Sequence, residues 1–145
     1  MKTRIITAIV LATIGLASCS ESDTFALRDQ CTEDAYWYSG EFDVNRWTKV
    51  SDRDGLNSYY MADVRVPRLD YEIMRGGLVN CYLFVNCNTQ TPLPCVRHYE
   101  NADGQLWTRT IDYEYYDGGV TVFVTDSDFS GDVPDPMTFR IMLSW

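Results

Sequence analysis

The chain has 145 residues, with 21 acidic and 12 basic side chains, and its formal net charge at pH 7 is −9. This acidic balance excludes the basic surface that binds nucleic-acid phosphates, and it disfavours direct attraction to anionic lipid head groups. The length suits one domain rather than two. We therefore expect a single core and no nucleic-acid partner.

The amino-terminal segment has the organisation of an export signal. Lys2 and Arg4 form a basic start, and the uncharged run Ile5–Leu16 follows. This run of 12 residues is too short for a transmembrane helix, which needs about 20 residues. The pattern predicts a secretory signal peptide that is removed.

Residues 16–19, LASC, resemble the lipobox of bacterial lipoproteins. This resemblance implies cleavage before Cys19 and attachment of lipid to the Cys19 sulfur. The next residues, 20–23 (SESD), resemble the serine-and-acid export signal of Bacteroidota lipoproteins, which implies display on the outer face of the outer membrane. The competing interpretations are an ordinary signal peptide with a chance cysteine and a plain polar tether.

These features divide the chain into three parts. We expect a signal peptide over residues 1–18, a lipidated cysteine and polar tether over 19–34, and one domain over 35–145. The mature chain then has 127 residues and a net charge of −11, because the signal peptide removes two basic residues. The lipid on Cys19 is the expected link to the membrane.

The rest of the chain has the alternation of β-structure. Alternating apolar positions and β-branched or aromatic residues predict strands at 34–44, 58–66, 77–87, 95–100, 106–116, 120–125 and 137–145. The last of these strands predicts that the terminal Trp145 is buried in a sheet. Leu69, Ile73 and Met74 share one helical face, and Gly76 can end that helix. We therefore predict an all-β fold, an antiparallel β-sandwich of about seven strands with one short helix; a small closed barrel is the alternative.

Three segments of the domain resemble a broad group of small, uncharacterised Bacteroidota outer-membrane lipoproteins: "VPRLDYEIMRGGLVNCYLF", "LPCVRHYENADG" and "TFRIMLSW". In that group a short helix precedes a G-x-V-x-x-Y strand, a Leu-Pro pair opens the next strand, and an F-R strand closes the domain. The resemblance covers most of residues 35–145 and implies a sandwich scaffold. It implies no catalytic residue.

Four cysteines remain beside the lipidated one, namely Cys31, Cys81, Cys87 and Cys95. An even number in an exported chain predicts two disulfides. Cys81 and Cys87 would lie about 20 Å apart on one strand, too far for a bond. We expect Cys87 to pair with Cys95 across a turn-rich segment and Cys31 to pair with Cys81. The pairing of Cys31 with Cys87 and of Cys81 with Cys95 remains open. Zinc is disfavoured because no C-x2-C pair is present.

Catalytic and metal motifs are sparse in this sequence. His98 is the single histidine, and no G-x-S-x-G motif occurs, so a nucleophilic triad lacks a base. Asp126, Asp128, Ser130 and Asp132 follow the start of a calcium-binding loop, but the twelfth position of that loop is Met137 instead of glutamate. The alternative to calcium is an acidic turn, and we expect no other cofactor.

Aromatic residues give the functional lead, because ten tyrosines and four tryptophans exceed what one sandwich core requires. Rings on a sheet face can stack on sugars or anchor a protein partner. The candidate ligand-binding rings are Trp37, Trp107, Tyr113, Tyr115 and Tyr116. We expect a non-enzymatic surface accessory that binds a glycan or another outer-membrane protein. The alternative is a small carboxylate-based hydrolase acting on glycans, which needs two carboxylates in one cleft.

Overall fold

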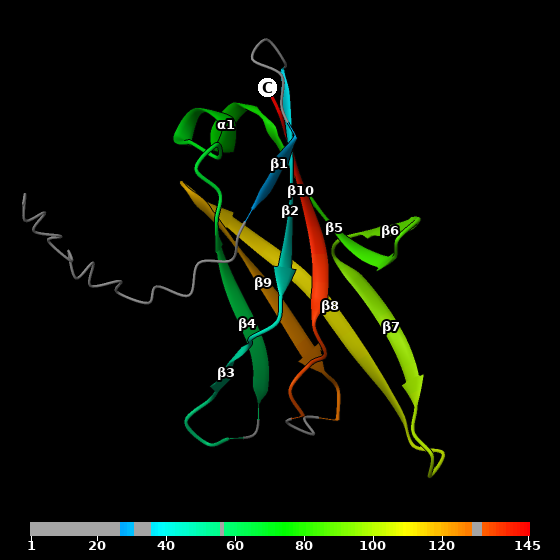
Figure 1. The fold of residues 1–145 in the computed structure, drawn as a ribbon. Helices are drawn as coiled ribbons and strands as arrows, with labels where there is room; N and C mark the ends of the chain where they lie inside the picture. Colours follow the sequence, from blue (N-terminus) through cyan, green and yellow to red (C-terminus); the bar gives the residue numbers. More distant parts are fainter. Residues whose placement is uncertain (1–26, 31–35, 56, 129–131) are drawn as a thin grey trace, which may run out of the picture.

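The computed structural model describes residues 27–30, 36–55, 57–128 and 132–145. Within these ranges the chain forms ten strands and one short helix (Figure 1). The strands make two five-stranded antiparallel sheets. The predicted all-β sandwich is confirmed.

The first sheet has the strand order β1-β2-β10-β5-β6. Its strands are β1 (Arg28–Gln30), β2 (Trp37–Val44), β10 (Met137–Ser144), β5 (Leu78–Asn86) and β6 (Thr89–Pro92). The C-terminal strand β10 is central, since Phe139 lies opposite Phe42 of β2 on one side and Leu83 of β5 on the other. Apolar residues at alternate positions of β10 supply the buried face that a central strand needs.

The second sheet has the strand order β3-β4-β9-β8-β7. Its strands are β3 (Thr48–Ser51), β4 (Ser58–Arg65), β9 (Gly119–Asp126), β8 (Leu106–Tyr116) and β7 (Cys95–Glu100). Strand β8 pairs with β7 along residues 106–111 and with β9 along residues 109–116. Because the two ranges share residues 109–111 alone, the outer part of the β7–β8 hairpin extends to one side of the sandwich, at the lower right of Figure 1.

The core fills the space between the inner faces of the two sheets. Its buried side chains come from alternate positions of the long strands, as the period of two in a strand requires. They include Tyr38, Phe42, Val44, Tyr60, Ala62, Val64, Cys81, Leu83, Ile111, Val120, Val122, Val124, Phe139, Ile141 and Leu143. The rings of Phe42 and Phe139 stack with centroids 5.5 Å apart, which joins β2 to β10.

Helix α1 (Tyr71–Gly76) closes one end of the sandwich. The Asp70 carboxylate accepts a hydrogen bond from the Ile73 amide at 2.9 Å, which caps the first turn. Of the predicted helical face, Ile73 is buried and Met74 is partly buried against the core, whereas Leu69 is buried but precedes the helix, whose N-cap is Asp70. Among the described residues, no helix combines the length and the hydrophobicity needed to cross a membrane.

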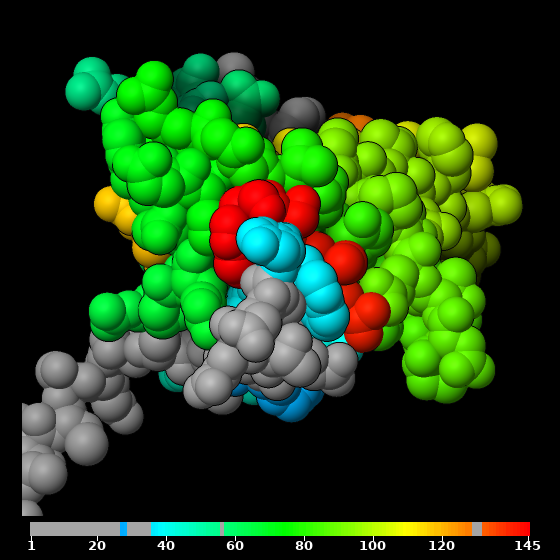
Figure 2. All heavy atoms as spheres, turned by 90° about the horizontal axis from the view of Figure 1, so that it is seen from above, coloured from blue at the N-terminus to red at the C-terminus, as the bar shows by residue number. Residues whose placement is uncertain are grey.

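The expectation that the terminal Trp145 is buried is wrong. Its side chain is 45% exposed, because β10 ends at Ser144. The Trp145 amide donates to the Tyr36 carbonyl at 3.2 Å, which ties the last residue to the chain just before β2. Figure 2 shows the red C-terminal residues at the surface between the cyan start of β2 and the green segment that contains α1.

Three strands lie outside the seven that the sequence predicts. They are β1, β3 and β6, each three or four residues long and each at an edge of its sheet. Such short edge strands carry no stretch of alternation long enough to be recognised. Strand β1 also lies upstream of the expected domain start at residue 35, in the segment assigned to the tether.

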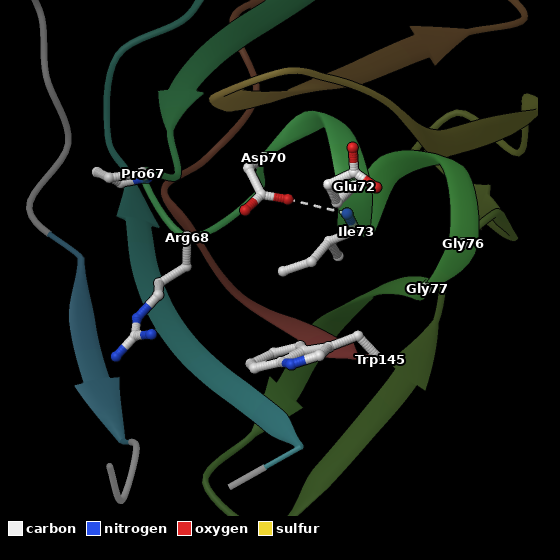
Figure 3. A pocket seen from close by; sticks show the side chains of 8 residues that line it. All are labelled: Pro67, Arg68, Asp70, Glu72, Ile73, Gly76, Gly77 and Trp145. Atoms are coloured by element: carbon white, nitrogen blue, oxygen red, sulfur yellow. Dashed lines mark hydrogen bonds between the residues drawn. The ribbon is translucent and has the colours of Figure 1, made fainter. Parts of the chain in front are cut away.

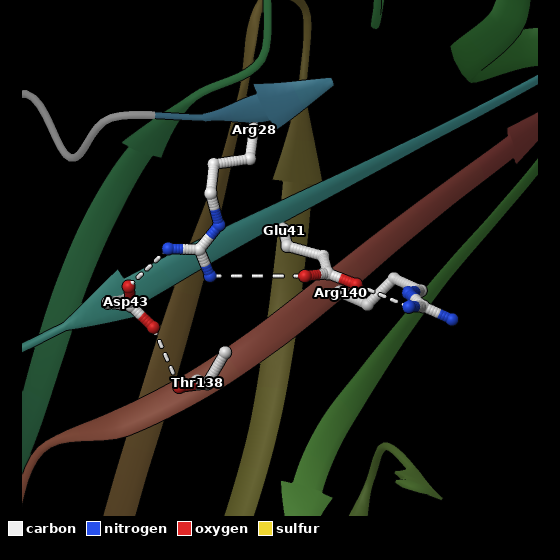
Figure 4. A network of polar contacts seen from close by, with 5 residues as sticks. All are labelled: Arg28, Glu41, Asp43, Thr138 and Arg140. Carbon is white, nitrogen blue, oxygen red and sulfur yellow. Dashed lines mark hydrogen bonds and ion pairs between the residues drawn. The ribbon is translucent and has the colours of Figure 1, made fainter. Parts of the chain in front are cut away.

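A network of ion pairs fixes β1 to the outer face of the first sheet (Figure 4). Arg28 Nη1 donates to Asp43 Oδ2 at 2.7 Å, and Arg28 Nη2 lies 3.9 Å from Glu41 Oε2. Glu41 also accepts from Arg140, and the Thr138 hydroxyl donates to Asp43 Oδ1 at 2.7 Å. The hydrogen bonds from Arg28 and Thr138 hold the pKa of Asp43 below its usual value.

The predicted disulfide between Cys87 and Cys95 is not formed, since both are free thiols. Cys87 follows the end of β5 at the turn of the first sheet, whereas Cys95 begins β7 opposite Ile111 in the second sheet. Cys81 is a free, buried thiol, so the open alternative of Cys81 with Cys95 is not formed either. Cys31, its expected partner, lies outside the described residues, as does Cys19, the predicted lipidation site.

Candidate functional site

The structure does not bring the five predicted aromatic residues together. Trp37 begins β2 of the first sheet, opposite Ser144. The other four lie on β8, with Trp107 near its start and Tyr113, Tyr115 and Tyr116 towards its end. Because successive residues of a strand point to opposite faces, Tyr116 lies on the face opposite to Tyr115. These positions form no single platform.

Tyr113 is held in place by the fold. Its hydroxyl donates to the Val79 carbonyl at 2.9 Å, which links the second sheet to the first. Burial raises the pKa of Tyr113. Tyr115 is 43% exposed, and its ring centroid lies 6.3 Å from that of Tyr113. At this end of β8, Tyr115 is thus an exposed ring beside a structural one.

Tyr116 is also engaged by its neighbours. Its hydroxyl donates to Asp63 Oδ1 at 2.7 Å. Burial, together with this hydrogen bond, raises the pKa of Tyr116 to about 12. Its ring covers Gly119, where an added Cβ would lie 2.3 Å from the ring. Tyr116 therefore packs the end of the β8–β9 hairpin.

Trp107 of β8 forms a stacked pair with a ring of the neighbouring strand β7. Its ring stacks on Tyr99, with centroids 4.4 Å apart and planes 15° apart. The two residues lie directly opposite each other in the β7–β8 ladder. Tyr99 is 40% exposed, so the pair reaches the surface.

Tyr99 is absent from the sequence-based candidates, although the sequence contains the signal that finds it. The residues between β7 and β8 fold into a turn in which Asn101 Oδ1 accepts from the amides of Asp103 and Gln105. Gly104 completes this turn with φ +76°. Counting outward from an Asn-x-Asp-Gly turn places Tyr99 opposite Trp107.

Two arginines lie next to the ring pair along the same face. Arg97 and Arg109 are directly opposite each other in the β7–β8 ladder. Arg109 forms two hydrogen bonds with Asp126 of β9, each 2.8 Å long, and both side chains are nearly buried. The Asp126 hydrogen bond raises the pKa of Arg109. The Arg109 guanidinium also lies 5.0 Å from the Trp107 ring centroid, which restricts both groups.

These residues line an open hollow of about 640 Å³ between the two sheets, which we call the β7–β8 cleft. One wall consists of Arg97, Tyr99 and Arg109 from the second sheet. The other wall includes residues 83–85 of β5 and residues 135–138 at the start of β10. A second hollow, of about 250 Å³, lies against Trp107 and Leu106. His98 and Tyr99 line both hollows, so the ring pair stands between them.

The candidate calcium loop is built differently from a calcium site. Both carboxylate oxygens of Asp126 accept from Arg109, so this first ligand position already has a cation partner. Among the described residues, no group of three or more His, Cys, Asp or Glu side chains could hold a metal ion. Ser130 lies outside the described residues, and Asp128 and Asp132 are exposed.

Another hollow, of about 450 Å³, lies beside α1 (Figure 3). The Trp145 indole lies below Ile73 in this view, and the Asp70 carboxylate points to the Ile73 amide that it caps. Arg68 extends away from the indole. The polar groups of this hollow do not converge on one point, and Asp70 is already used by the helix cap.

A further hollow, of about 390 Å³, lies on the outer face of the second sheet. Its lining includes Asp112, Glu114, Tyr59 and Phe123. The rings of Tyr59 and Phe123 meet edge to face with centroids 5.9 Å apart. Burial, and then the negative charge of Glu114, raise the pKa of Asp112. Two carboxylates, Asp112 and Glu114, thus share this surface depression, and one of them has a raised pKa.

The β7–β8 cleft combines a stacked ring pair, arginine donors and an open shape, which suits the binding of an extended polar ligand. The His98 side chain is exposed, and no hydrogen bond from its imidazole to another described residue orients it as a general base. Comparison with protein-family models, curated proteins and solved structures finds no match for this chain.

Proposed function

We propose that the protein is a cell-envelope lipoprotein, anchored to the outer membrane by lipid on Cys19 and facing the cell surface. Its sandwich domain is a non-enzymatic binding module for a glycan. The anchor is supported by the lipobox-like residues 16–19 and the following SESD segment. The binding role is supported above all by one observation, the Tyr99–Trp107 stack between two hollows.

The geometry of this pair fits an extended sugar chain. A flat ring at the surface buries the apolar face of a sugar without a deep pocket, while neighbouring polar groups bind its hydroxyls. Arg97 and Asp135 line the cleft and supply donors and acceptors of this kind. Tyr99 lines both hollows. A glycan lying across the ring pair would therefore place more than one of its sugar units against the protein.

A glycan array probed with the wild-type chain and two variants tests the binding role. Trp107→Ala removes half of the ring pair, and Tyr36→Ala removes an exposed ring near β2 as a matched control. We expect binding to fall at least tenfold in Trp107→Ala, since stacking and hot-spot rings contribute about 2 kcal/mol or more, and to persist in Tyr36→Ala. Equal thermal midpoints confirm that both variants fold. Glycan binding that ignores Trp107 would refute the proposal, and capture of an outer-membrane protein through Trp107 would favour the protein partner instead.

The anchor has its own test. Mass spectrometry of the mature protein should find Cys19 as the first residue with acyl chains attached, and Cys19→Ala should release the protein from the membrane fraction. An unmodified leader on the native protein would contradict the anchor and leave the binding role intact.

A carboxylate-based hydrolase is the second candidate, and the hollow at Asp112 and Glu114 favours it. A raised pKa on one of two neighbouring carboxylates is the arrangement that acid–base hydrolysis uses. Incubation with bound glycans should release new reducing ends if this candidate holds, and Asp112→Asn should abolish their release. Binding without cleavage supports the non-enzymatic module.

A further inference from the structure

The arginine pair of the β7–β8 cleft is unusual in its charge balance. Arg97 and Arg109 face each other directly across the ladder, and like charges in that position destabilise a sheet. The charge of Arg109 is compensated by two hydrogen bonds with Asp126. Arg97 has no carboxylate within ion-pair distance among the described residues. Its Nη2 donates to the neutral Thr91 hydroxyl at 2.7 Å.

The remaining donors of Arg97 are available to a ligand. A guanidinium has five N–H donors, and the Thr91 hydroxyl receives one of them. A side-chain nitrogen of Arg97 that was both buried and without a partner would be an unsatisfied donor. Among the described residues, the unsatisfied buried nitrogens belong to Trp47 and Arg140, and none belongs to Arg97. The other nitrogens of Arg97 therefore stay in contact with solvent, at the wall of the cleft.

We propose that the β7–β8 cleft binds an acidic polysaccharide, with the carboxylate of a uronic acid unit on Arg97 and the sugar ring against the Tyr99–Trp107 stack. This inference rests on the proposed glycan-binding function and names its ligand class. A carboxylate accepts two parallel hydrogen bonds from a guanidinium, so it fits Arg97 in shape and in charge. It would also give the charge of Arg97 the carboxylate partner that the described residues do not supply.

The other charged groups at the cleft are compatible with this ligand. Asp135 lines the opposite wall and is exposed, and its negative charge contributes to the field at Arg109. Its oxygens suit the hydroxyls of a neighbouring sugar. His98 is exposed at the boundary between the two hollows. The mature protein is otherwise acidic, with a net charge of −11. A polyanion is therefore repelled from most of its surface and can bind best where Arg97 supplies a positive charge.

Calorimetric titration of the full mature chain with matched probes tests this inference. The probes are oligomers of polygalacturonate, alginate and hyaluronan, each as the free acid and as the methyl ester, so that esterification removes the charge and adds a single methyl group to each uronic acid. We expect at least one free acid to bind about tenfold or more tightly than its ester, because hydrogen bonds to charged groups contribute more than neutral ones. This preference should shrink between 50 and 500 mM NaCl as salt screens the pair.

Three variants assign the preference to Arg97. Arg97→Gln should bind acid and ester equally, and Arg97→Lys should recover only part of the preference because it lacks the planar fork. Arg65→Gln changes the charge equally at an exposed position on β4 and should behave like the wild type. Arg97→Gln should unfold at nearly the same temperature as the wild type, since the glutamine amide can still donate to the Thr91 hydroxyl. A structural role for Arg97 would lower that temperature instead.

The outcomes separate the two proposals. Equal binding of acid and ester by the wild type, with both lost in Trp107→Ala, would overturn the acidic-sugar inference and leave glycan binding standing. Failure of all six probes to bind would overturn the inference as well. An acid preference that survives in Arg97→Gln would also overturn it. Binding that is the same in Trp107→Ala and the wild type would remove the glycan-binding function itself.

Discussion

Two adjacent glycines differ sharply in what surrounds them. At Gly77 an added Cβ would lie 2.6 Å from the Ser144 carbonyl and 2.9 Å from the Ile73 carbonyl, both of them backbone atoms. At Gly76, within α1, an added Cβ would meet nothing within 4 Å. The close approach of α1 to β10 therefore depends on Gly77, although Gly76 is the residue that the sequence suggests as the helix end.

Substitution of these glycines should give opposite effects. We expect Gly77→Ala to destabilise the protein by about 1–3 kcal/mol, the usual cost of overpacking. Gly76→Ala should be neutral or stabilise it by up to about 1 kcal/mol, because alanine lowers the entropy of the unfolded chain and favours a helix. Denaturant unfolding of the two variants measures both values. Equal stabilities would show that the backbone near Ser144 can shift to accommodate a Cβ at position 77 without a loss in the free energy of unfolding.

The described thiols also differ in their surroundings. Burial raises the pKa of Cys81 to about 12, so its reactive thiolate is scarce at neutral pH. Cys87 is exposed at the end of β5. The prediction of disulfides used only the number and spacing of the cysteines. Whether two thiols meet, and how reactive each one is, depends on the strand and sheet in which each cysteine lies.

Alkylation of the native protein should distinguish these thiols. We expect iodoacetamide at pH 8 to label Cys87 within minutes and to label Cys81 only after unfolding, with peptide mass spectrometry as the readout. Unfolded protein labelled at both positions is the control. Recovery of Cys87 in a disulfide-linked peptide before reduction would contradict the structure and restore the pairing expected from the sequence.

At the scale of elements, β1 is a short strand whose attachment to β2 is reinforced by a side-chain ion pair. It has three residues, and Arg28 ties it to Asp43 of β2. The pKa of Asp43 is lowered in the folded protein. A lowered carboxylate pKa means that the stabilisation is complete above the ordinary value of 3.8 and is lost as the pH falls below it.

Acidification should therefore release β1 before the rest of the sheet. In hydrogen exchange corrected for intrinsic rates, the β1 amides should keep their protection from pH 6 down to about pH 4 and lose it at lower pH, while those of β10 keep theirs. Asp43→Asn should expose β1 already at pH 6 and show little further change at pH 3. Asp117→Asn, in the turn between β8 and β9, is the control and should follow the wild type. Unchanged protection of β1 in Asp43→Asn would show that its backbone hydrogen bonds suffice.

The long strands were predictable because their alternation extends over six or more residues, and the sheets follow from it. Strands such as β1 are too short and too polar for that signal. The Tyr99–Trp107 pair could have been found from the sequence, because the turn between two alternating strands fixes which residues lie opposite each other. The opening beside the pair could not be predicted, because it depends on how far the β7–β8 hairpin extends past the first sheet.

At the scale of the molecule, the position of the tether matters for the sandwich. Strand β1 covers the outer edge of β2, pairing Arg28 with Glu41 and Gln30 with Ser39. Leu27 packs against the core just before it. A domain that starts at residue 35, as the sequence suggests, would lack both features and expose a long edge strand, which is a site of self-association.

Two truncated chains test this view. A chain that starts at residue 27 should be monomeric, whereas a chain that starts at residue 36 should self-associate with rising concentration in sedimentation velocity. The shorter chain should also lose about 1–2 kcal/mol of stability, because it leaves out a partly buried leucine. Two monomers of equal stability would show that the sandwich is complete without β1.

The order of strands in the first sheet separates β1 from β6 by the full width of that sheet. The chain enters the domain at the β1 side, and the β7–β8 cleft opens near β5 and β6. With the anchor that we propose on Cys19, the β7–β8 cleft would therefore lie on the side of the first sheet that is farther from the membrane attachment. Polymers too large to approach the bilayer closely could still bind in this cleft, at a distance from the membrane surface.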